Sequence, residues 1–265
     1  MKLLRFLLVV AASFGLVSCF EMKSSVVVNK DGSATVEETV LIGAQLAAMM
    51  AQGGGQGGPG EQLKGLMLDK ESAEKRAKDL GEGVTVKSIE EVKSADGKTG
   101  NKVVYAVADI RKLNYKPNTP DDKPEGEKKE GDEMTFTLEG STLTITNPEA
   151  DKKKGDGAEK PKKSPEELAA MKGQMAMMKP MLAGMRMTVE VKAAGGIATS
   201  DASHQTADTV TYIDIQFDKL MENFDAFAEM MEGMDGMSMS DAAKKFEKVD
   251  GMKIEGKKVV KIDLK

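Results

Sequence analysis

The side chains with the most distinctive chemistry contain sulfur, because the chain has 20 methionines but only one cysteine and one histidine. One methionine cluster spans residues 175–187. A second cluster consists of Met230, Met231, Met234, Met237 and Met239. Thioether sulfur is a soft ligand for Cu(I), so this second cluster makes a Cu(I)-binding protein one alternative.

The same methionines have two further interpretations. Methionine fills irregular cores and adapts to apolar surfaces. The helical spacing of the first cluster and the absence of a histidine near either cluster favour packing over metal binding, since His204 lies 26 residues before Met230. A lipid-contacting surface is the third interpretation, because flexible thioether side chains adapt to irregular apolar partners such as acyl chains.

The single cysteine, Cys19, ends a segment with the features of a secretory signal. Lys2 and Arg5 precede an apolar run at residues 6–17, and the small residue Ser18 follows. A basic start, a short apolar stretch and a small-residue cleavage site are typical of such signals. The apolar run is too short to span a membrane by itself, since a spanning helix needs about 20 apolar residues.

With Cys19 directly at the cleavage point, this segment resembles a bacterial lipoprotein signal with its lipobox. The resemblance implies that residues 1–18 are a signal peptide, that the Cys19 thiol is lipidated, and that residues 19–23 form the lipidated tether. Stable anchoring requires two or more acyl chains, such as palmitate, and a lipoprotein carries at least two. We therefore predict a membrane-anchored protein of the bacterial cell envelope, at the outer membrane or on its periplasmic face.

Composition and motifs narrow the remaining functions. The net charge of −5 argues against nucleic acid as a partner. Catalytic and metal motifs such as Cys-x-x-Cys, His-Glu-x-x-His and Gly-x-Ser-x-Gly are absent from the sequence, and the Gly-rich stretch at 53–58 lacks the ending of a phosphate loop. We predict a non-enzymatic protein with no cofactor.

Turn signals divide the chain into hairpins. Three hairpins are expected at residues 24–43, 83–109 and 134–146, turning at Asp31-Gly32, Asp96-Gly97 and Glu139-Gly140. Further strands are expected within 187–216 and 258–264. Helices are expected at 61–80, 165–181, 219–231 and 242–249. This pattern predicts an α+β fold, with an antiparallel sheet built from hairpins and helices packed on one face.

Residues 24–265 are expected to form one envelope domain interrupted by polar segments. Flexible insertions are predicted at 52–60, 116–132 and 149–163, because these stretches offer too few apolar residues to bury.

Several of these features together resemble the LppM-domain lipoproteins over roughly residues 23–220. They are a lipidated Cys19 before a strand, the turn at 31–33, a helix ending at Leu80-Gly81, and the paired strands at 187–217. The resemblance implies an α+β domain that contacts lipids or other envelope molecules, and it carries no site residues. We therefore predict a binding or structural module that reaches the membrane through Cys19 and contacts lipid or an envelope protein.

Overall fold

The computed structural model describes residues 20–44, 46–48, 69–117, 133–152, 185–222 and 237–265, with positions 166, 167, 170, 173, 182, 184 and 227. Cys19 and three methionines of the second cluster, Met230, Met231 and Met234, lie outside the described residues. The predicted insertion at 52–60 also lies outside the described residues. The same holds for residues 118–132 and 153–163 of the other two predicted insertions, and for most of the predicted helix at 165–181.

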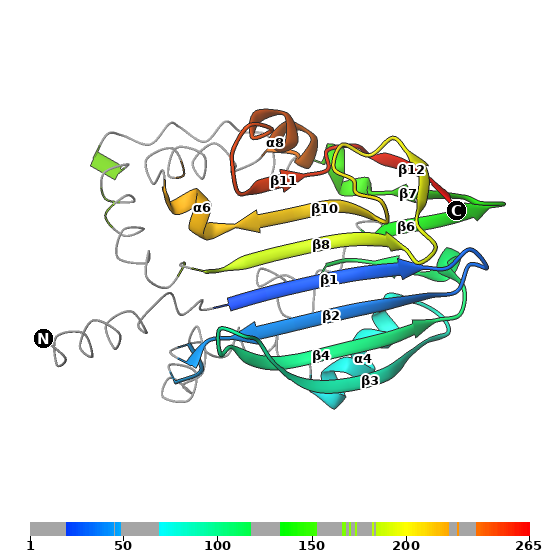
Figure 1. The fold of residues 1–265 in the computed structure, drawn as a ribbon, viewed down its shortest axis with the longest axis horizontal. Helices are drawn as coiled ribbons and strands as arrows, with labels where there is room; N and C mark the ends of the chain where they lie inside the picture. The colour runs from blue at the N-terminus through cyan, green and yellow to red at the C-terminus, as the bar shows by residue number, and fades with distance from the viewer. Residues whose placement is uncertain are drawn as a thin grey trace, which may run out of the picture.

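A seven-stranded sheet forms the larger layer of the molecule (Figure 1). Its strands, in spatial order, are β11 (Met252–Ile254), β10 (Thr209–Gln216), β8 (Arg186–Ala193), β1 (Phe20–Val28), β2 (Ala34–Ile42), β4 (Thr99–Val107) and β3 (Val84–Lys93). The predicted β1–β2 and β3–β4 hairpins are confirmed. The first turns at Gly32, whose φ of 88° suits glycine, while the Asp31 carboxylate accepts a hydrogen bond from the Ser33 amide.

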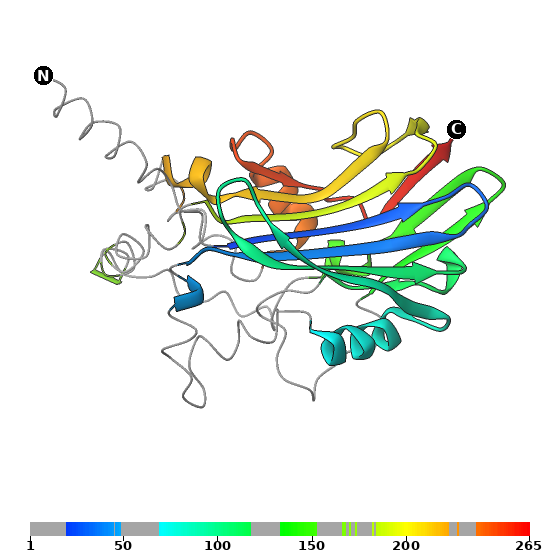
Figure 2. The ribbon, with the colours of Figure 1, turned by 60° about the horizontal axis from the view of Figure 1, so that its bottom comes forward.

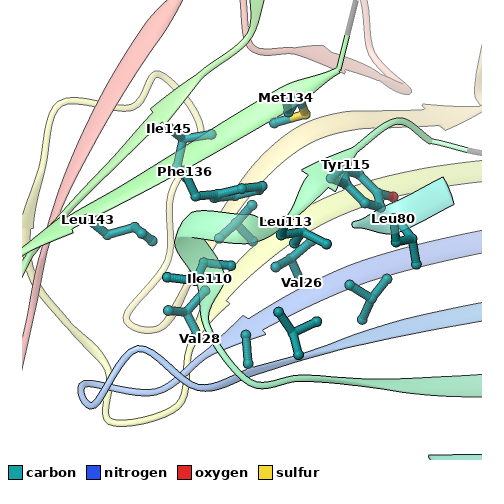
Figure 3. Packing of buried hydrophobic residues seen from close by; sticks show 14 of the residues in the cluster. Val26, Val28, Leu80, Ile110, Leu113, Tyr115, Met134, Phe136, Leu143 and Ile145 are labelled. Carbon is teal, nitrogen blue, oxygen red and sulfur yellow. The ribbon is translucent and has the colours of Figure 1, made fainter. Parts of the chain in front are cut away.

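A five-stranded sheet packs against one face of the larger sheet. Its strands, in spatial order, are β5 (Asn114–Tyr115), β6 (Met134–Glu139), β7 (Thr142–Thr146), β12 (Val259–Leu264) and β9 (Ile197–Ser200). Figures 1 and 2 show that it lies at the end of the larger sheet away from Phe20. Figure 3 shows Val26 and Val28 of β1 on one side of the buried core and Phe136, Leu143 and Ile145 on the other, with Ile110 and Leu113 between them.

Helices make up a small part of the described chain. They are α4 (Lys70–Leu80), α6 (Phe217–Glu222) and α8 (Met239–Lys245), with the 3₁₀ turns η2 (Ile110–Lys112) and η3 (Pro148–Asp151). Asp69 caps α4 by accepting a hydrogen bond from the Ser72 amide at 2.8 Å. The helix buries only the narrow face that carries Ala73, Ala77 and Leu80.

The predicted α+β architecture, with helices covering one face of an antiparallel sheet, is therefore wrong. The fold is β-rich, and a second sheet rather than a helical layer covers the core face. Strand periodicity shows which side chains share a face, but not whether two hairpins join one sheet or face each other. The predicted hairpin at 134–146 forms as β6 and β7, yet it belongs to the second sheet.

The larger sheet also contains a parallel pair at its centre. β1 and β8 run in the same direction, with Glu21 opposite Arg186 and Val28 opposite Ala193. These strands are more than 150 residues apart in the sequence, and local turn chemistry carries no information about such a pairing.

Two predicted boundaries differ from the structure. Residues 20–23, expected to belong to a tether, are the first part of β1, and Phe20 and Met22 are buried. The predicted insertion at 149–163 begins within η3, where Ala150 is fully buried. The composition of a short segment does not show the partners that cover it, and both segments are covered by other parts of the fold.

Candidate functional site

The candidate metal ligands that the structure describes are used for packing. Met237 and Met239 pack against a buried apolar cluster that includes Leu220, Phe246 and Met252. The Met239 sulfur also accepts a hydrogen bond from the Asn147 amide at 3.7 Å. Within the described ranges, no group of three or more His, Cys, Asp or Glu side chains is arranged to hold a metal ion.

The candidate lipidation site, Cys19, directly precedes one end of the seven-stranded sheet. Strand pairing aligns Phe20 with Ile42 of β2, and Ile42 with Thr99 of β4. On the other side, Glu21 aligns with Arg186 of β8. We call this end of the strands, seen at the left of Figure 1, the Phe20 end.

An apolar cluster lies at the Phe20 end on the same face of the sheet as the core. Phe20, Met22, Val40 and Ile42 are its buried members, because alternate residues of β1 and β2 point to this face. Side chains packed against them are partly buried: Leu46, Ala47, Met185 and Met187. This Phe20-end cluster is separate from the core between the two sheets.

A belt of polar side chains lies between the Phe20-end cluster and the core. Glu38 stands on β2 between Val36 of the core and Val40 of the cluster, and its side chain is 4% exposed. Arg76 reaches down from α4 to bind it, with Nη2 at 2.8 Å from Oε1. The same guanidinium donates to the carbonyl of Lys116.

Serine and tyrosine complete this polar belt. Ser24 on β1 lies between Met22 and Val26, and it accepts a hydrogen bond from the buried Tyr115 hydroxyl. The Tyr105 hydroxyl is buried and has no hydrogen-bond partner among the described residues. Burial, reinforced by the Glu38 carboxylate, raises the pKa of Tyr105 and keeps its hydroxyl protonated.

Charge is retained within the belt despite its burial. Burial disfavours the Arg76 cation, but the Glu38 carboxylate outweighs this effect and raises the pKa of Arg76. The Arg76 cation is therefore retained in the interior beside the Glu38 side chain, where an unpaired charge would be costly. Glu38 and Ser24 therefore separate the core from the Phe20-end cluster on β2 and β1, whereas Val103 and Val189, at the same level of β4 and β8, belong to the core.

The opposite face of the larger sheet is polar. Glu190 of β8 accepts a hydrogen bond from the Ser25 hydroxyl at 2.7 Å and pairs with Lys23 and Lys192. Burial alone would raise the pKa of Glu190, but these hydrogen bonds and cations outweigh it and lower the pKa. This face therefore carries polar and charged side chains, several of them buried, and the other face of the sheet is the apolar one.

Comparison with known proteins places few limits on function. No protein-family model matches the chain, and no curated protein matches it. The chain is similar to the NMR structure of the folded domain of the LppM protein of Mycobacterium tuberculosis, with 10% identity over 77% of this chain and 85% of that one. This structural neighbour is distant, since a TM-score of 0.30 is too low to define a common fold.

None of the helices that the structure describes is long and apolar enough to cross a bilayer.

Proposed function

We propose that the protein is a membrane-anchored lipoprotein of the bacterial envelope, acting as a non-enzymatic module that contacts lipid at its Phe20 end. One observation carries the proposal: Cys19, the predicted lipidation site, directly precedes Phe20, which is already a buried residue of a central strand.

The lipid anchor and the apolar cluster would lie close together. Consecutive Cα atoms are about 3.8 Å apart, so acyl chains on Cys19 would begin one residue from the Phe20-end cluster. Each buried CH₂ group contributes about 0.8 kcal/mol to membrane binding. Met185 and Met187, partly buried in the cluster, are side chains that adapt to irregular apolar partners.

Cell fractionation of a Cys19→Ser variant tests the anchor. The wild-type protein is expected in the membrane fraction, and the variant is expected in the soluble fraction or as the unprocessed precursor. A Cys19→Ser protein that is processed normally and stays with the membrane would contradict the proposal.

Photocrosslinking from lipid headgroups tests the lipid contact. Vesicles that contain a phospholipid with a photoreactive headgroup are mixed with the lipidated protein, irradiated and digested. Peptides that contain Met185 and Met187 are expected to carry crosslinks. The matched control is the peptide around Met252, which is buried in the cluster between α8 and β11. Equal labelling of both peptides, or labelling of Met252 alone, would contradict lipid contact at the Phe20 end.

A further inference from the structure

Phe20, the residue that follows Cys19, is already the first residue of β1. Phe20 is already paired with Ile42, and Glu21 is paired on both sides, with Leu41 and Arg186. β1 is flanked by strands throughout, since it lies fourth in the seven-stranded order. A lipid group on Cys19 would therefore be attached one residue before the start of a central strand rather than to a long arm.

The tip of the β3–β4 hairpin is fixed at the same end. Lys98, in the tip, donates to the Glu21 carboxylate at 2.8 Å and lies 3.2 Å from Asp96. Thr99 lies at the level of Ile42 and Phe20 in the strand pairing, so the hairpin tip at residues 94–98 extends past the level of Phe20. α6 also begins at this end, because Gln216 pairs with Arg186.

The chemistry of this end suits the headgroup layer of a bilayer. Asp96 and Lys219 are partly exposed there and give the end both signs of charge. The tip residues Ser94, Ala95 and Gly97 are small, so the tip has no large apolar side chain to insert among acyl chains. Contact at the depth of zwitterionic headgroups matches this surface better than deeper insertion.

From these observations we infer that the seven-stranded sheet stands upright on the membrane, with its Phe20 end resting on the lipid headgroups. The inference depends on the proposed lipid anchor at Cys19. β1 has nine residues, and at about 3.3 Å per residue its far end lies about 30 Å from the Phe20 end. The β1–β2 turn and the β6–β7 turn would therefore point away from the bilayer.

Headgroup quenching tests this orientation in the full-length, lipidated protein. Ala95→Cys places a fluorophore on the hairpin tip, and Lys30→Cys places one on the β1–β2 turn, both at exposed positions. Because Cys19 is the only native cysteine and would carry the lipid, the introduced thiol is the one available for labelling. The labelled proteins are reconstituted in phosphatidylcholine vesicles that carry a nitroxide on the headgroup.

We expect strong quenching at position 95 and little at position 30. Equal quenching at both positions, or stronger quenching at position 30, would overturn the inference. Vesicle flotation of the same samples separates the two proposals: protein that fails to float contradicts the lipid anchor, whereas floating protein without the contrast contradicts only the orientation.

A flexible insertion tests the cause of the orientation. Six Gly and Ser residues placed between Cys19 and Phe20 should leave flotation unchanged and reduce the difference in quenching between positions 95 and 30. An undiminished difference would overturn the claim that the short connection sets the orientation.

Discussion

The ammonium group of Lys98 lies 2.8 Å from the carboxylate of Glu21, which joins the tip of the β3–β4 hairpin to the second residue of β1. Burial opposes the charge on Lys98, but hydrogen bonds to Glu21 and Asp96 outweigh it and raise the pKa of Lys98. The ion pair holds the first residues of β1 at the point where the predicted lipid attachment meets the folded domain.

Removing this ammonium group should loosen the start of β1. In Lys98→Met we expect amide hydrogen exchange at residues 20–23 to become about tenfold faster, since a charged hydrogen bond contributes about 1.5 kcal/mol. The matched control is Lys112→Met, which removes an exposed pair with Glu82. Exchange at residues 20–23 that is equally slow in both variants would show that the ion pair does not restrain β1.

Breaking the buried pair between α4 and β2 should destabilise the whole domain. Arg76→Met leaves the Glu38 carboxylate buried without its cation, and we expect a loss of about 3–5 kcal/mol in the free energy of unfolding. Lys70→Met on the same helix removes only the exposed pair with Glu74, and it should cost less than about 1 kcal/mol. Denaturant unfolding measures both variants, and similar costs would contradict an ionised pair in the interior.

The double variant Arg76→Met with Glu38→Met checks the origin of that loss. Apolar replacements of a buried ion pair are often neutral or stabilising, so the double variant should recover much of the stability lost in Arg76→Met. If it is as unstable as the sum of the two single variants, the loss comes from packing rather than from an uncompensated charge.

Acid should weaken the polar face of the larger sheet through Glu190. Its pKa is lower in the folded protein than the ordinary value of 4.5. The interaction therefore stabilises the protein fully above pH 4.5, and this stabilisation is lost as the pH falls through the lowered pKa. Glu190→Gln should reduce the unfolding free energy by about 1.5 kcal/mol at neutral pH, and the deficit should shrink below about pH 4.5.

Stability measured against pH, with Glu90→Gln as the control, tests this prediction. Glu90 is exposed on the edge strand β3. A deficit of Glu190→Gln that stays constant into acid would show that the charge of Glu190 does not contribute to stability.

Local sequence signals predicted the hairpins, and one signal for the polar belt was visible in the strands. Every second residue of β2 faces inward: Ala34, Val36, Glu38, Val40 and Ile42. Glu38 is therefore a charged residue in a series that is otherwise apolar. A buried charge requires a partner, and the sequence does not show that the partner is Arg76, 38 residues away on a helix.

Longer-range pairings could not be predicted in the same way. The β1–β8 parallel pair and the second sheet depend on contacts between distant segments, which no turn motif encodes. β11 was missed because three residues are too few to show alternation, and it forms only by pairing with β10.

The methionine cluster gives a test between packing and Cu(I) binding. Met237→Leu should change stability by less than about 1.5 kcal/mol, the usual range for swaps that conserve volume. Met239→Leu should cost more than Met237→Leu, because it also leaves the buried Asn147 amide without its sulfur acceptor.

Anaerobic titration with Cu(I) against a chelator completes this comparison. Binding weaker than about micromolar is expected, because neutral thioethers without histidine or cysteine offer the metal little charge. Tight, stoichiometric uptake by the wild type that is lost in the variant with Met234, Met237 and Met239 all changed to Leu would favour the soft-metal alternative.

Mass spectrometry of the protein purified from bacterial membranes shows whether Cys19 carries a lipid. We expect a mature chain that begins at Cys19, with a mass increase equal to a diacylglyceryl group on that residue and an acyl chain at its amino terminus. A protein that retains residues 1–18, or whose Cys19 is an unmodified thiol, would contradict it.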